Sequence, residues 1–487
     1  MPDAPALADL ETKTLAELHE IAAELDVKRF RALRREELID GIIAAAAERG
    51  GRDAPPAGDR SRPRRLEIEE VDELDEADDH RSAEAPAWEP RLRAEAGDPE
   101  EEEEPEEEEP EHAEEDGEVE PEQRSGVLDL VPDGFGFLRV EGLGRSRDDV
   151  YLPRAVVRSL GLRKGDHVAG PARRSNRGER HPSIGRVELV NGSPVEESPE
   201  ERPWFDSLTP IQPTDRLRLQ ADQEDVAVRM VDLLAPIGKG QRCLVVAPPG
   251  SGATTLLRAL ARVIVRDSSA APMMVLVDAR PEEVTDWTRG VDVPVHASAA
   301  DRSSDAHVQL ADLALERAKR LVEQGHDVVV VLDSISRLAR AHSLARPRSR
   351  RDADESEALS AEAMGVQAAK RWFSTARNTE EGGSLTILAA VRVVPEGPVD
   401  ALYGALLDIA NMELRLDSEL AQSGYHPALD TRRSYNRREA ELLGEDQARS
   451  LQHLRRSLIP LSAAEAWTET VERLRSTPSN DQLLGSI

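Results

Sequence analysis

Cysteine is almost absent from this 487-residue chain, in which Cys243 stands alone. A single cysteine excludes an internal disulfide framework and suits a reducing compartment. Cys243 lies in the apolar run 243–246, with no metal-ligand pattern or base beside it. We therefore expect it to be a small residue of a buried core.

Long hydrophobic runs are missing as well. No apolar stretch approaches the ~18 residues of a membrane span, and no signal-peptide pattern opens the sequence. The run DVVVVLD at 327–333 is far too short to span a bilayer and is typical of a buried strand. We expect a cytoplasmic protein without a membrane partner.

Positive charge is outweighed overall, because 63 Lys and Arg stand against 95 Asp and Glu and give a formal net charge of −32. Residues 98–122 alone hold 17 acidic side chains and no Lys or Arg, and without them the charge would be −15. Segment 126–190 reverses the sign, with 12 Arg and Lys against 8 Asp and Glu. The global charge therefore does not exclude a nucleic-acid partner.

Composition divides the chain into four segments, of which the first three are small. Residues 7–48 predict a helical module, since Thr14 and Glu17 form a capping box before leucines at helical spacing. Residues 50–123 are rich in Pro, Glu, Asp and Arg and predict a disordered acidic linker. Short alternating runs over 124–195 predict a small antiparallel barrel.

The fourth segment, 205–480, alternates apolar runs with helical patterns. Continuous apolar runs predict buried strands of a parallel sheet that helices cover on both faces. The expected strands are 243–247, 273–278, 327–333 and 385–391, and the helices between them include 255–265 and 307–324. The chain is thus a multidomain protein of α+β and α/β architecture.

Aromatic residues make up only 3% of the sequence, which makes DGFGFLR at 133–139 informative. Phe135 and Phe137 share one face of a strand, and Tyr151 follows on the next strand. Such rings either fill a barrel core or stack on the bases of single-stranded nucleic acid. Flanking glycines and the cation of Arg139 favour stacking.

The stretch APPGSGATT at 247–255 joins a strand pattern to a helical pattern, as a phosphate-binding loop does. Its glycines can wrap phosphates, and the Thr254 hydroxyl can hold Mg²⁺. Ala253 stands where such a loop needs a lysine. A glycine-rich turn without lysine also occurs in proteins that bind no nucleotide, so the motif alone leaves both interpretations open.

Taken in order, several blocks resemble the bacterial transcription termination factor Rho family. They include GVLDLVPDGFGFLR, DDVYLP, SLTPIQPTDRLRL, PIGKGQRCLVVAPP, DARPEEVTD, DVVVVLDSISRLARAHS and NMELRL. The resemblance is weak over residues 10–48 and strong over 126–480. It implies an OB-fold or cold-shock-like RNA-binding barrel and a RecA-type ATPase domain. It also implies a homohexameric ring that binds single-stranded RNA, uses ATP with Mg²⁺, and releases transcripts from RNA polymerase.

The resemblance also assigns positions to the expected sites. RNA contacts fall on Phe135, Phe137, Arg139 and Tyr151. Nucleotide contacts fall on Gly238, Gly240, Gly250, Ser251, Gly252, Ala253, Thr254, Thr255 and Arg280, and Mg²⁺ ligands on Thr254 and Asp333.

Several positions depart from the family pattern. Ala253 replaces the loop lysine, Ala279 the glutamate that activates water, and Ser418 the arginine finger. Leu406 replaces a ring that stacks on adenine, and we assign no catalytic residue. The sequence therefore predicts a Rho-like termination factor, with a non-hydrolysing RNA-binding ring or modulator as the alternative. A scaffold that recruits partners through its acidic linker is a third, weaker hypothesis.

Overall fold

The computed structural model describes residues 122–173, 180–197, 202–219, 225–266, 270–345, 355–393 and 400–487. The predicted helical module at 7–48 lies outside the described residues. So does the predicted acidic linker at 50–123, apart from its last two residues, which begin the first described strand.

The first described domain is a small closed barrel. Strand β1 pairs antiparallel with both β2 and β4, so the order β1-β2-β3-β5-β4 closes on itself. Leu128, Leu138, Val150 and Leu152 alternate inward and fill its core. The elements are β1 Glu122–Leu130, β2 Gly136–Arg139, β3 Val150–Leu152, α4 Arg154–Ser159, β4 His167–Arg173, β5 Ser183–Ile184, β6 Leu189–Val190 and β7 Ser193–Pro194.

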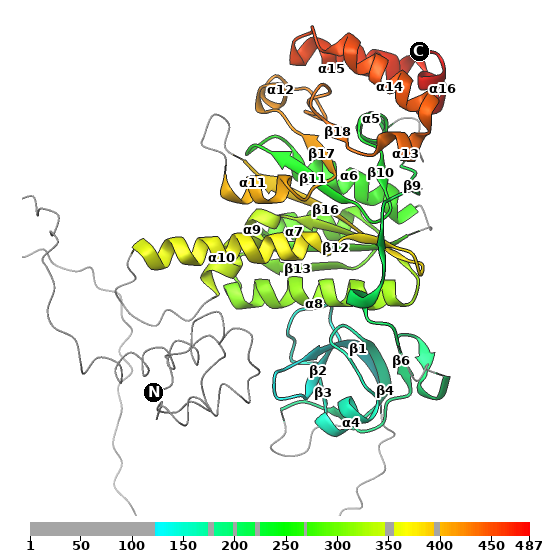
Figure 1. The fold of residues 1–487 in the computed structure, drawn as a ribbon. Helices are drawn as coiled ribbons and strands as arrows, with labels where there is room; N and C mark the ends of the chain where they lie inside the picture. The colour runs from blue at the N-terminus through cyan, green and yellow to red at the C-terminus, as the bar shows by residue number, and fades with distance from the viewer. Residues whose placement is uncertain are drawn as a thin grey trace, which may run out of the picture. The chain divides into compact units, whose positions relative to one another are not determined.

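A mostly parallel sheet forms the second domain, with strand order β13-β12-β14-β16-β11-β17-β18 (Figure 1). All neighbours on this path are parallel except β17 and β18. The strands are β8 Pro210–Ile211, β9 Arg216–Leu217, β10 Ile237–Gly238, β11 Arg242–Ala247, β12 Ala271–Ala279, β13 Val295–Ala299, β14 Asp327–Asp333, β15 Arg377–Thr379, β16 Ser384–Arg392, β17 Met412–Arg415 and β18 Tyr435–Asn436.

Helices cover the sheet on both faces. Helices α5, α6 and α14 to α16 pack on one face, and α8 to α11 on the other. The helices are α5 Val226–Leu234, α6 Ala253–Arg266, α7 Pro281–Gly290, α8 Ser304–Glu323, α9 Ile335–Leu344, α10 Glu355–Ser374, α11 Ala401–Leu407, α12 Ser418–Gln422, α13 Glu439–Leu443, α14 Glu445–Leu458, α15 Ala463–Ser476 and α16 Asn480–Gly485.

The predicted architecture is confirmed, and its four predicted strands are β11, β12, β14 and β16. Cys243 is fully buried in β11, where burial raises the pKa of its thiol. Across the described residues, no helix combines the length and apolar character that crossing a bilayer requires.

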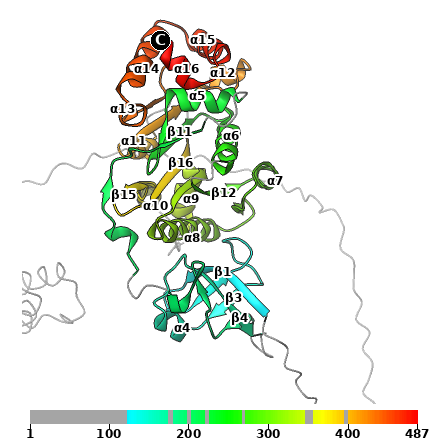
Figure 2. The same cartoon turned by 90° about the vertical axis from the view of Figure 1, so that its right-hand side faces the viewer.

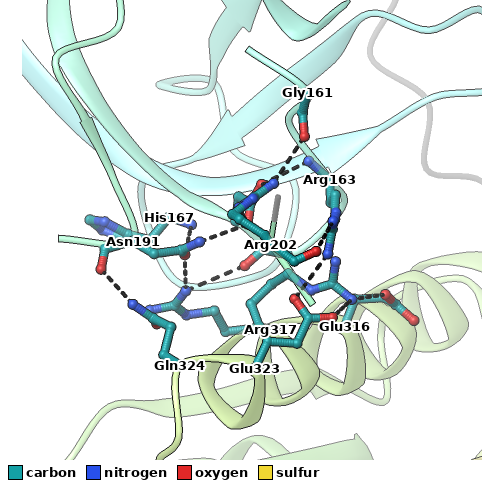
Figure 3. A network of polar contacts seen from close by, with 12 residues as sticks. Gly161, Arg163, His167, Asn191, Arg202, Glu316, Arg317, Glu323 and Gln324 are labelled. Carbon is teal, nitrogen blue, oxygen red and sulfur yellow. Dashed lines mark hydrogen bonds and ion pairs between the residues drawn. The ribbon is translucent and has the colours of Figure 1, made fainter. Parts of the chain in front are cut away.

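Helix α8 lies between the sheet and the barrel, and a polar cluster ties the barrel to it (Figures 1, 2 and 3). At its centre the fully buried Asp166 accepts hydrogen bonds from Arg202 at 2.8 and 2.9 Å and from Asn191 at 2.7 Å. Asn191 in turn accepts from Arg317 of α8 at 2.7 Å. A Cβ on Gly165 would lie 2.5 Å from the backbone of α8, so only glycine permits this close approach.

Replacing Asp166 with alanine is expected to lower the stability of the folded unit by ~3–5 kcal/mol, because it leaves buried cationic and amide groups without their acceptor. The midpoint of urea unfolding, followed by tryptophan fluorescence, measures the loss. Asp148→Ala is the matched control, because Asp148 is exposed in the same domain. Equal midpoints for the two variants would contradict a structural role for the Asp166 cluster.

Candidate functional site

Three aromatic rings gather on one side of the barrel. Phe137 of β2 pairs in register with Tyr151 of β3, and Phe135 immediately precedes β2. Their ring centroids lie 5.5 to 6.0 Å apart. All three side chains are only partly buried, and none belongs to the hydrophobic core of the barrel. Their placement favours a binding surface over core filling.

A pocket of about 430 Å³ opens beside these rings. The His181 ring meets Phe137 with a centroid distance of 5.3 Å. The pocket is lined by Phe137, Tyr151, Pro153, Arg173, Arg180, His181 and Ser183. The site therefore combines π faces with guanidinium groups.

Arg139 occupies a different place from the rings. Its side chain is buried and forms ion pairs with Asp129 and Asp149, so its charge is neutralised inside the barrel. Its guanidinium carbon lies 5.7 Å from the centroid of the Phe137 ring. Among the residues that the structure describes, Arg139 Nε and Asp149 Oδ1 are buried and have no hydrogen-bond partner. Arg139 thus supports the aromatic face from inside the barrel, whereas the resemblance placed it among the RNA contacts.

The phosphate-loop candidate turns between β11 and α6. Gly250 and Gly252 have φ of 76° and 88°, the left-handed region that favours glycine. A Cβ on either glycine would meet no atom within 4 Å, so the loop faces open space. Ser251 closes the turn by donating to the carbonyl of Pro248 at 2.7 Å. The free N–H groups at the start of α6 can then bind an anion.

Thr254 and Asp333 meet at the edge of the sheet. The Thr254 hydroxyl donates to Asp333 Oδ2 at 2.6 Å, although the two residues are 79 positions apart. Mg²⁺ is usually held by one or two protein oxygens together with water and phosphate oxygens. This donor pair fits such an ion. Over the described segments there is no group of three or more His, Cys, Asp or Glu residues arranged for a metal.

The other predicted positions of this edge differ in exposure. Ala253, the first residue of α6, is partly exposed, and Thr255 is exposed. Ala279 is only 1% exposed, whereas Arg280 is exposed at the start of α7. Ser418 begins α12, and Leu406 is fully buried.

Gly238 and Gly240 lie just before β11, whereas the phosphate loop follows that strand. Six residues of strand separate the two ends by about 20 Å. A Cβ on Gly240 would lie 2.2 Å from the backbone nitrogen of Asn378, and one on Gly238 would meet Leu442 and Pro213 at 2.9 Å. Close packing therefore accounts for these glycines, and they do not belong to the phosphate-loop site.

Sequence reasoning missed two features of these sites. His181 is distant from Phe137 in the sequence, and no spacing rule connects the two rings. Asp278 carries a left-handed φ of 50° at the end of β12 and faces His307 of α8. In the sequence DARP, Asp278 is marked only by its place next to Ala279, the position at which the resemblance implies a glutamate.

The fold defines a nucleic-acid-binding type of barrel attached to a RecA-type domain with a phosphate loop. Comparison with known families agrees with both parts. Residues 124–196 match "Rho termination factor, RNA-binding domain", and residues 227–436 match "ATP synthase alpha/beta family, nucleotide-binding domain". Residues 9–51 match "Rho termination factor, N-terminal domain".

Relatives along most of the chain are transcription termination factors named Rho. The protein of Streptomyces lividans is 43% identical over 368 residues, which cover 74% of this chain and 51% of that protein. The protein of Chromobacterium violaceum is 38% identical over 371 residues, covering 74% and 87%. The matched segment thus spans about half the length of the Streptomyces relative. The chain belongs to the transcription termination factor Rho family.

Proposed function

We propose that this protein is a Rho-type transcription termination factor. In this proposal the barrel binds single-stranded RNA, and the phosphate loop binds ATP with Mg²⁺. A ring of six subunits then couples ATP hydrolysis to release of the transcript from RNA polymerase in the cytoplasm. Family membership supports the whole, and the aromatic cluster supports the RNA site directly.

The aromatic cluster is the observation that carries the proposal. Phe135, Phe137 and Tyr151 are partly exposed, although leucine and valine side chains suffice to fill the barrel core. Each base stacked on such a ring is worth ~1–3 kcal/mol, and arginines beside the rings attract phosphates.

At the nucleotide site, the backbone around Gly250 and Gly252 would wrap the phosphates, and Thr254 with Asp333 would hold Mg²⁺. The bound ion supplies neutralisation of the charge that develops on the β- and γ-phosphates. Exposed Arg280 is a further phosphate contact in this proposal.

Binding without turnover is the second candidate function. Ala253, Ala279 and Ser418 lack the cation, the carboxylate and the second cation that the family uses at these positions. A protein of this kind would capture transcripts or modulate an active Rho.

Phosphate release by the purified full chain, with and without pyrimidine-rich RNA, tests the proposal. We expect RNA to stimulate slow hydrolysis of ATP. The affinity of the protein for RNA should fall steeply as the salt concentration rises. Tight RNA binding without any phosphate release would favour the second candidate. If the protein neither binds RNA nor releases phosphate, the proposed RNA-dependent function is overturned. Light scattering of the same sample checks the six-subunit ring.

A further inference from the structure

The edge of the sheet that lacks the family's water-activating glutamate holds another carboxylate. Asp278 immediately precedes Ala279, and its side chain is 32% exposed. Strand β12 has an irregular register between Val277 and Ala279 where it pairs with β13, which makes Asp278 the bulged residue. Bulges of this kind redirect a side chain and occur beside active sites.

The backbone of Asp278 is in an uncommon conformation. Its φ of 50° lies in the left-handed region, which costs a non-glycine residue of order 1 kcal/mol or more. Asp and Asn tolerate this region better than other residues that carry a side chain. The surrounding contacts therefore hold Asp278 in a conformation that its own backbone does not prefer.

Strand register places Asp278 close to the phosphate-loop site. Leu276 pairs in register with Asp333, whose carboxylate accepts the Thr254 hydroxyl. Asp278 is two residues further along the adjacent strand. A strand spacing of about 4.8 Å and a rise of about 3.3 Å per residue put its α-carbon roughly 8 Å from that of Asp333.

The buried residues His307 and Ser298 lie next to this carboxylate. His307 Nε2 lies 3.8 Å from Asp278 Oδ1, and His307 Nδ1 lies 2.7 Å from Ser298 Oγ. Burial lowers the pKa of His307 more than Asp278 and Asp301 raise it, which favours the neutral imidazole. When the Ser298 hydroxyl donates to Nδ1, Nε2 carries the proton and faces Asp278.

The neighbouring carboxylates are less suited to act on a bound nucleotide. Glu283 is engaged by Arg337 at 3.1 Å and by the N–H of Arg280 at 3.2 Å. Burial raises the pKa of Glu283, but these hydrogen bonds outweigh it and lower the pKa overall. Within the described residues, by contrast, no hydrogen bond occupies the carboxylate of Asp278, and the neutral ring of His307 lies 3.8 Å from it.

We propose that Asp278, packed beside His307, is the carboxylate that activates water for ATP hydrolysis in this chain. The water oxygen bonds to the γ-phosphorus, and the bond to the β,γ-bridging oxygen breaks. ADP leaves with that electron pair, and the proton of the water passes to Asp278 and then to solvent. His307 and Ser298 are positioning residues. The inference rests on the hydrolytic part of the proposed function.

The test compares the RNA-stimulated ATPase of the full-length wild type with that of Asp278→Asn. Asparagine keeps the shape and tolerates the left-handed backbone, so only the base is lost. We expect kcat to fall about 100-fold, in the range of a lost general base, with KM for ATP changed less than about threefold. Binding of a fluorescent ATP analogue and the melting temperature should stay at their wild-type values.

Two further variants complete the test. Glu282→Gln is the matched control, because Glu282 is an exposed carboxylate on the first turn of α7, and it should keep wild-type kcat. Ser298→Ala should lower kcat while leaving KM unchanged, which a merely structural role would not do. If the wild type hydrolyses ATP and Asp278→Asn does so within about twofold, this inference is overturned while the proposed function stands. A wild type that binds RNA without hydrolysis would reject the hydrolytic function together with the inference.

Discussion

Replacing Ala253 with lysine is expected to raise RNA-dependent ATPase kcat/KM by about 100-fold. A lysine charge ~4 Å from a phosphate oxygen is worth about 4 kcal/mol at an effective dielectric constant of 20, before desolvation is subtracted. A net gain of ~2.7 kcal/mol corresponds to about 100-fold in rate. Steady-state phosphate release with saturating RNA measures the effect.

The structure allows the lysine to reach its target. Ala253 is the partly exposed first residue of α6, and side chains on a helix lean toward its N-terminus. The introduced side chain therefore extends toward the open side of Gly250 and Gly252. Thr254 and Asp333 already meet there.

Ala253→Met separates charge from bulk, because methionine has a similar length and no cation. It should leave kcat/KM near or below the wild-type value. Equal gains in the Lys and Met variants would contradict the electrostatic explanation. No gain in either variant would show that the missing cation does not limit turnover.

The sheet could be predicted from sequence because continuous apolar runs leave little choice. A segment such as 327–333 must be buried on both faces, and its length suits a strand. The strand, turn and helix over 243–265 were equally readable, since the glycines of the turn lie within one local stretch, whereas the motif alone left its binding of phosphate open. Strand β13 was not predicted, because VHASA is short and its side chains are mostly half-buried.

Contacts between distant segments were beyond local sequence patterns, although the family resemblance placed Thr254 and Asp333 in one Mg²⁺ site. The Thr254–Asp333 hydrogen bond depends on the order β11-β16-β14, which no local pattern encodes. The burial of Arg139 depends on Asp129, which lies on β1, and on Asp149, which immediately precedes β3. Sequence proximity to the two phenylalanines suggested a shared surface, whereas barrel closure turned this side chain inward.

The double variant Phe135→Ala/Phe137→Ala is expected to weaken single-stranded RNA binding by about 100-fold or more. Two lost stacking contacts at ~1–3 kcal/mol each account for this loss. Fluorescence anisotropy with a labelled pyrimidine oligonucleotide measures it. The salt dependence of binding should keep its slope, because phosphate contacts by the arginines remain.

Phe135→Leu/Phe137→Leu distinguishes stacking from packing. Leucine keeps most of the apolar volume but removes the π face on which a base stacks. If the rings bind RNA, the leucine variant loses nearly as much affinity as the alanine variant, while both retain a folded barrel. If the rings serve packing alone, leucine restores both stability and RNA affinity. Because the rings lie outside the barrel core formed around Leu128 and Leu138, we expect the first result.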